Sequence, residues 1–115
     1  MKKIILLTIL VLSAIVANAT TYRVKYDVAN ERSTSFVVNV SYDKIAINGT
    51  TYSLRRMGII TNSGFVFDSY CYGSNQERLF CVATTPITVQ KNAFTTLRGY
   101  IMLIDGKAYL ADKID

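Results

Sequence analysis

Apolar and polar residues alternate along most of the chain after residue 20. The first such segment is 22–28, where Tyr22 and Val24 are separated by Arg23 and followed by Lys25. A period of two places the apolar side chains on one face of an extended chain, so a strand with one charged face is predicted there. Further strands are predicted over 36–42, 45–47, 50–54, 64–73, 79–84, 87–90, 100–104 and 107–111.

Two short turn motifs join some of these segments into hairpins. Asn48-Gly49 and Asp105-Gly106 each stand between β-rich flanks. Both central residues of a type I′ turn need a positive φ, which Asn, Asp and Gly adopt most readily. The stretch 91–96 is the least regular, and one helical turn would fit it. The whole pattern predicts a single all-β domain over residues 20–115, a small antiparallel barrel or sandwich of about eight short strands.

The first nineteen residues have the three parts of a secretory signal peptide. Met1-Lys2-Lys3 is a short basic start, 4–17 is an uncharged apolar run, and Ala17-Asn18-Ala19 places small residues at a cleavage site. A membrane-spanning helix needs about 20 apolar residues, which is more than this run offers. We therefore predict that residues 1–19 are cleaved, that the protein is periplasmic or secreted, and that it keeps no stable membrane anchor.

Charge and composition narrow the function further. Removing Lys2 and Lys3 lowers the formal charge from +5 to +3, which is too small to indicate a nucleic-acid partner. The chain has no His, so the commonest general base and every His-ligated metal site are excluded. We therefore expect no metal, no cofactor and no enzymatic activity.

Cys71 and Cys81 are the two cysteines of the chain. An exported chain enters an oxidising compartment, where two cysteines are expected to pair. The segment 73–77 is turn material, and a hairpin centred near Gln76 would place Cys71 opposite Cys81. A hairpin disulfide is therefore predicted, and closing so short a loop would stabilise the domain by about 3 kcal/mol.

Tyrosine and arginine supply candidate binding residues. The chain has eight Tyr, which offer large amphipathic surfaces suited to protein interfaces and to stacking on sugar rings. Half-buried strands also favour Tyr, so this excess has a structural explanation as well. Tyr70 and Tyr72, which point away from Cys71, are the preferred candidates. Arg55 and Arg56 form the densest positive spot, but on a strand they face opposite ways, so they make no patch by themselves. We interpret them as solvated charges, one of which is a candidate contact for an acidic partner.

A pair of carboxylates could hydrolyse glycosides without His, provided that two acids lie about 5–10 Å apart. Most of the acids fall in or beside predicted turns. Asp68 is the best candidate because it interrupts an aromatic-rich strand. Simple alternation would instead turn Asp68 outward, opposite Phe65 and Phe67. A carboxylate-based hydrolase is therefore kept as the second alternative function.

The outline of a signal peptide, a short all-β domain and one disulfide resembles small periplasmic inhibitors of lysozyme. Those inhibitors carry a Ser-Gly loop, followed shortly by Tyr, that enters the lysozyme cleft. Asn62-Ser63-Gly64-Phe65 matches this loop in part, with Phe65 where Tyr would be expected. The resemblance covers the architecture and these residues, and it implies that Ser63, Gly64 and Phe65 contact a protein partner. The outline is also similar to glycan-binding subunits of secreted bacterial toxins.

Together these features predict a non-enzymatic exported β-domain that binds a protein partner in the cell envelope or outside the cell, as an envelope-targeted inhibitor would. The first alternative is a small-ligand or glycan-binding module that uses a barrel interior or a Tyr platform. A sizeable apolar cavity would favour that alternative, and an interior filled by side chains would exclude its interior form.

Overall fold

The computed structural model describes residues 19–114, and all of their regular structure is β-strand. The strands are β1 (Thr20–Asp27), β2 (Arg32–Val40), β3 (Lys44–Ile47), β4 (Thr50–Asn62), β5 (Phe65–Tyr72), β6 (Arg78–Ala83), β7 (Ile87–Asn92), β8 (Thr95–Ile104) and β9 (Lys107–Lys113). The prediction of an all-β fold is confirmed. The stretch 91–96, where a helical turn would fit, instead forms the end of β7, a turn and the start of β8. The predicted signal peptide lies outside the described residues except for Ala19.

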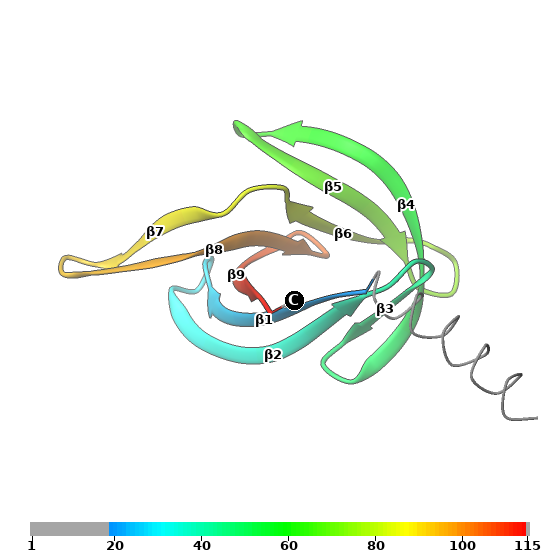
Figure 1. Ribbon diagram of the computed structural model, residues 1–115, viewed down its shortest axis with the longest axis horizontal. Coiled ribbons are helices and arrows are strands. Elements are labelled where there is room, and N and C mark those ends of the chain that lie inside the picture. The colour runs from blue at the N-terminus through cyan, green and yellow to red at the C-terminus, as the bar shows by residue number, and fades with distance from the viewer. Residues whose placement is uncertain (1–18, 115) are drawn as a thin grey trace, which may run out of the picture.

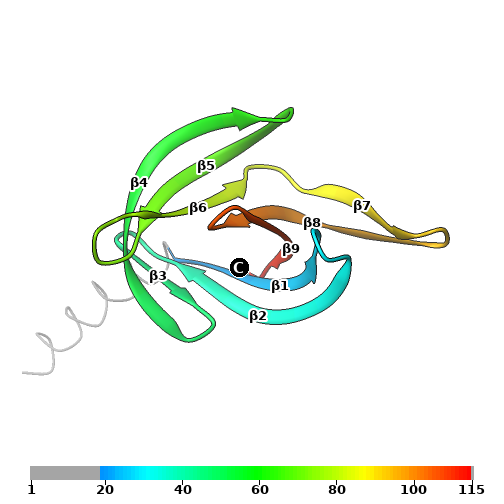
Figure 2. The same ribbon diagram turned by 180° about the vertical axis from the view of Figure 1, so that it is seen from behind.

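The strands form one antiparallel sheet whose pairings return to their starting point. β1 to β6 pair in chain order, β6 then pairs with β8, β8 with β9, and β9 with β1. β7 pairs with β8 alone and continues along it beyond β6, so the two form a long hairpin that extends away from the closed part (Figure 1). Seen from behind, the β4–β5 hairpin also projects from the closed part, in another direction (Figure 2).

The predicted turns have the expected backbone. Asn48 and Gly49 have φ values of 50° and 87°, and Asp105 and Gly106 have 54° and 84°. A third pair, Ser63-Gly64, has 54° and 84° and joins β4 to β5. Positive φ at both central residues is the type I′ signature, which matches the twist of the two flanking strands.

The main core fills the middle of the closed part. Its fully buried members include Val24, Ile45, Tyr72, Phe80 and Met102, and every strand except β7 contributes at least one buried side chain to it. A smaller cluster lies on the opposite face of β5, β6 and β8. It consists of Phe67, Cys81 and Ala83, with Ile101 and Leu103 packed against them.

The predicted disulfide is wrong. Cys71 lies opposite Leu79, and Cys81 lies opposite Ser69, so the hairpin is centred on Asn75 and not on Gln76. This places the two cysteines diagonally across the ladder, where Cα atoms are about 7–8 Å apart, beyond the usual range for a disulfide. Both thiols are free, and the Cys81 Sγ lies 3.7 Å from the Ser69 Oγ.

A reducing agent should therefore leave the melting temperature unchanged. With no bridge to break, the unfolded chain gains no freedom on reduction. Thermal melts followed by circular dichroism, with and without dithiothreitol, test this. Alkylation counted by mass spectrometry is the control: the partly exposed Cys71 should react in the native protein, and the buried Cys81 only after unfolding. A fall of several degrees on reduction would contradict the expectation.

Within residues 19–114 the structure contains no helix long and apolar enough to cross a membrane.

Candidate functional site

All eight binding residues predicted from the sequence lie on one hairpin, β4–β5. Arg55 and Arg56 are on β4, Ser63 and Gly64 form the turn, and Phe65, Asp68, Tyr70 and Tyr72 are on β5. The ladder divides them between two faces, because Arg55 lies opposite Cys71 and Arg56 opposite Tyr70. The two arginines therefore point to opposite faces, as the alternation predicts.

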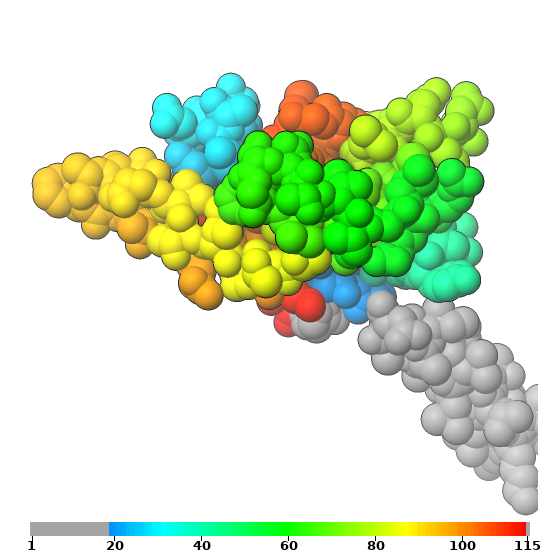
Figure 3. Space-filling model, turned by 90° about the horizontal axis from the view of Figure 1, so that it is seen from above, coloured from blue at the N-terminus to red at the C-terminus, as the bar shows by residue number. Residues whose placement is uncertain are grey.

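The outer half of this hairpin is rich in exposed apolar side chains. Ten large apolar side chains are exposed among the described residues, and half of them are here: Met57 (54%), Ile59 (55%), Ile60 (42%), Phe65 (36%) and Val66 (43%). We call these five residues the hairpin tip cluster. No other element covers the outer part of β4 and β5 (green) in the view from above (Figure 3).

The hairpin tip cluster occupies both faces of the hairpin. Ile59 lies opposite Asp68, on the face that continues into the main core, whereas Ile60 lies opposite Phe67 on the other face. Phe65 shares that second face, and its ring is 6.3 Å from the Phe67 ring. A β-hairpin that exposes apolar side chains on both faces can be buried only by a surface that encloses it.

One backbone edge of β4 is also unpaired in the described part of the chain. β3 pairs with Thr50–Ser53, and the Leu54 amide donates to the Asp43 carbonyl at 2.9 Å. From Arg55 to Asn62 only β5 lies alongside. The register shifts between Arg56 and Gly58, so Met57 has no partner residue on β5. Unpaired edges with apolar side chains are open to pairing with a further strand.

Arg56 and Asp68 form an ion pair at the base of the hairpin. The Arg56 Nη2 donates to the Asp68 Oδ1 at 2.7 Å. Tyr70 packs beside them with its ring 5.7 Å from that of Phe80, and burial raises the pKa of its hydroxyl. A cavity of about 290 Å³ adjoins this group and is lined by Thr20, Val40, Ser41, Tyr42, Arg56 and Tyr70. The Asp68 carboxylate is thus held by a cation and faces the core side of β5.

Tyr72 is fully buried and belongs to a hydrogen-bonded network. Its hydroxyl donates to the Asp105 Oδ2 at 2.9 Å, and the Arg78 Nη2 donates to the same oxygen at 2.7 Å. The Arg78 guanidinium also lies over the rings of Tyr52 and Tyr72, at 5.1 and 4.8 Å from their centroids. Tyr72 therefore stabilises the domain from within and cannot reach a partner in the folded state.

Most of the tyrosines are at least partly buried. Tyr22, Tyr26 and Tyr72 are buried, and only Tyr42, at 87%, is among the exposed large side chains. Burial raises the pKa of Tyr22 to about 12. The Tyr excess thus contributes mainly to packing, and an exposed Tyr platform does not form.

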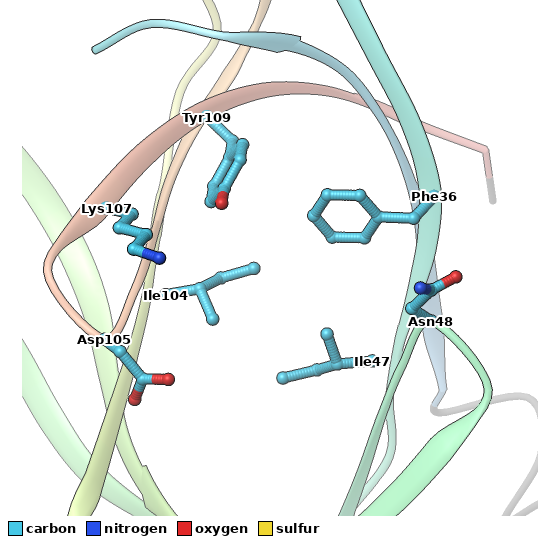
Figure 4. Close-up of a pocket in the computed structure, with 7 residues that line it drawn as sticks. All are labelled: Phe36, Ile47, Asn48, Ile104, Asp105, Lys107 and Tyr109. Atoms are coloured by element: carbon cyan, nitrogen blue, oxygen red, sulfur yellow. The ribbon is translucent and has the colours of Figure 1, made fainter. Parts of the chain in front are cut away.

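A second cavity, of about 260 Å³, lies at an end of the closed part. Figure 4 shows Phe36, Ile47, Ile104 and Tyr109 around an open space, with the Lys107 side chain extending toward it. Asn48 and Asp105 complete the lining. The sequence did not indicate that these residues form one site, because they come from segments far apart in the chain and only the pairing of β1 with both β2 and β9 brings them together.

Apart from Phe65, the hairpin tip cluster was not predicted from the sequence, for a different reason. Met57, Ile59 and Ile60 stand nearly side by side, so the period of two is lost there. Such a run reads equally well as a strand buried on both faces. The one signal that could have indicated a long, projecting strand is the absence of a turn motif between the Asn48-Gly49 turn and Asn62.

Carboxylates do not gather in pairs at either cavity described above. The cavity beside Lys107 is lined by one carboxylate, that of Asp105, and the cavity beside Arg56 and Tyr70 is lined by none. Within 19–114, no three His, Cys, Asp or Glu side chains come together as they would to hold a metal.

Comparison of the chain with models of protein families, with curated proteins and with solved structures found no match in any of the three.

Proposed function

We propose that the chain is an exported, non-enzymatic domain that binds a protein partner in the cell envelope or outside the cell, and that it inserts the β4–β5 hairpin into a cleft of that partner. The observation that carries this proposal is the hairpin tip cluster, where half of the exposed large apolar side chains of the described residues gather on one projecting hairpin. Apolar patches of this kind are typical of protein-binding surfaces.

Because the hairpin exposes apolar side chains on both of its faces, a cleft in the partner would bury more of them than a flat partner surface would. Ile59 and Val66 lie on one face, and Ile60 and Phe65 on the other. A flat partner would bury only one pair, whereas the walls of a cleft would bury both. Insertion of such a hairpin would block the cleft to other molecules, which is the action expected of an inhibitor. Ser63 and Gly64 would then enter the cleft first.

The free edge of β4 supports the same mode of binding. A strand from the wall of the cleft could pair with residues 55–62 and satisfy their unpaired backbone groups. Arg55 is exposed on this stretch and would favour an acidic partner surface beside the edge.

A partner-capture experiment tests the proposal. The exported protein is immobilised, a retained envelope protein is identified by mass spectrometry, and its Kd is measured with purified components. The double variant Ile59→Lys/Ile60→Lys, which places one charge on each face, should weaken binding by about 30-fold or more, since central apolar residues contribute most of the binding energy.

The matched control is Val37→Lys/Leu79→Lys, which adds the same charges at side chains of similar exposure on β2 and β6. The control variant should bind the partner with a Kd within about twofold of the unmodified protein's, because the substituted residues lie outside the proposed interface. Equal losses in both double variants, or retention of no partner at all, would refute the proposal.

The closed ring of pairings favours a barrel over a sandwich, and we include this in the proposal. In a barrel every strand pairs on both sides, which removes exposed edges that could aggregate. The exception in this ring is the outer part of β4, because β3 is too short to pair with it. The small-ligand alternative depends on a separate place, the cavity beside Lys107, since the middle of the ring is filled by buried side chains.

A further inference from the structure

We infer that the cavity lined by Phe36, Ile47, Asn48, Ile104 and Lys107, together with Asp105 and Tyr109, binds a small organic carboxylate with an apolar, ring-sized body. This site is separate from the hairpin proposed to bind a protein. Its volume of about 260 Å³ is below the usual range of drug-sized pockets, so a ligand of one ring fits and a glycan chain does not.

The walls of the cavity select an apolar body. The rings of Phe36 and Tyr109 meet edge to face with centroids 5.4 Å apart, and the aliphatic side chains of Ile47 and Ile104 form another part of the lining (Figure 4). Ile104 is buried, and Phe36 and Tyr109 are partly buried against the main core. An aromatic ring placed here would contact rings and methyl groups and would replace water that these groups cannot hydrogen-bond.

The charge at the cavity selects an anion. Asp105 and Lys107 both line it, but the Asp105 carboxylate is held by Arg78 and by the Tyr72 hydroxyl. Arg78 and Asp105 neutralise each other. Among the described residues, none forms a hydrogen bond or ion pair with the Lys107 side chain, so its ammonium group is the uncompensated charge of the site. A carboxylate beside it would gain a charge-assisted hydrogen bond.

Asn48 adds a neutral hydrogen-bonding group at the opposite side. It holds a positive φ of 50° in the β3–β4 turn, and its amide N donates to the Val37 carbonyl at 3.0 Å. The backbone is therefore fixed, and the exposed side chain lies at the edge of the space, across from Lys107 (Figure 4). With the carboxylate beside Lys107, the Asn48 side-chain amide can hydrogen-bond to a polar group, such as a hydroxyl, on the far side of the ring.

Titration of the full, exported, ¹⁵N-labelled protein with benzoate tests the inference by NMR. Benzoate should shift the amide signals of Phe36, Ile47, Asn48 and Lys107 saturably, with a Kd of about 1 mM, as expected for so small a ligand. Neutral benzamide, of the same shape, should bind about fivefold more weakly, which is the range for a partly exposed ion pair.

Two variants separate the charge effect from the fold. Lys107→Gln should make benzoate and benzamide bind equally while the remaining signals stay in place. Lys91→Gln, at an exposed position on β7, should keep the fivefold preference. The inference is overturned if benzoate causes no saturable shift, if the shifts map to the β4–β5 hairpin, or if benzamide binds the unmodified protein as well as benzoate does. None of these results depends on whether the hairpin binds a protein.

Discussion

Replacing Phe80 by Ala should lower the free energy of unfolding by about 3–5 kcal/mol, the range for truncating a buried aromatic side chain. Phe80 is fully buried on β6 and lies opposite Tyr70 on β5 and Ile104 on β8. β6 is the strand that closes the ring, and only three residue pairs join it to β8. The variant would leave a cavity at the closure, where neighbouring strands are held by their own pairings and cannot collapse freely.

Urea unfolding followed by circular dichroism measures this loss. Leu79→Ala is the matched control, because Leu79 directly precedes Phe80 on the same strand and is 54% exposed. It should cost under about 1 kcal/mol, as is usual for surface positions. Similar losses for Phe80→Ala and Leu79→Ala would show that β6 is not packed as the structure has it.

Replacing Asp105 by Ala should cost about 2–3 kcal/mol, since it removes hydrogen bonds to a charged group and leaves the buried Tyr72 hydroxyl without a partner. The loss should shrink in the background of Tyr72→Phe, where no hydroxyl remains to be left unpaired. Asp112→Ala is the matched control: its carboxylate is bound to Lys25 at 2.7 Å but is half exposed, so the cost should be under about 1 kcal/mol. Equal costs at Asp105 and Asp112 would contradict the network's role.

The same network should make stability fall in acid. Burial alone would raise the pKa of Asp105, but the hydrogen bonds from Arg78 and Tyr72 outweigh it and hold that pKa below its ordinary value. A lowered pKa in the folded state gives stability that is complete above the unfolded pKa of about 3.9 and is lost as the pH falls through the folded pKa.

Melting temperatures measured between neutral pH and acid should therefore fall below about pH 4, and less steeply for Asp105→Asn than for the unmodified protein. Some slope should remain in the variant, because the side-chain hydrogen bond of Asn30 lowers the pKa of Asp27 in the same window. Identical acid profiles in both proteins would show that Asp105 does not contribute.

Local patterns predicted part of every strand, because a strand's two faces differ wherever one of them is buried, but they missed residues 55–62 of β4 and 95–99 of β8. The alternation at 22–28 and 36–42 corresponds to β1 and β2, and the Asn48-Gly49 and Asp105-Gly106 turns have the expected backbone. The candidate residues from the β4–β5 region do share one hairpin. Their separation into a network around the buried Tyr72 and an exposed tip around Phe65 was not predictable, because it depends on how far the hairpin projects from the core.

The cysteine prediction failed through a difference of one residue. Moving the centre of the β5–β6 turn from Gln76 to Asn75 moves each residue's partner by two positions, so Cys71 meets Leu79. The turn segment is rich in residues that accept several turn geometries, so composition alone does not place its centre. The main-chain bond from the Gln76 amide to the Gly73 carbonyl, at 3.1 Å, is part of what places it in the fold.

By itself the sequence determined that the domain is made of antiparallel strands, where most of them lie and which turns join two of the hairpins, since these depend on side-chain alternation and on the φ preferences of single residues. The tertiary structure alone decided that β6 and β8 close the sheet and that Phe36, Lys107 and Tyr109 line one cavity. It also decided that residue 99 must be Gly, because a Cβ there would stand 2.6 Å from the Ala111 carbonyl oxygen. Each of these depends on contacts between segments far apart in the chain, which no local pattern encodes.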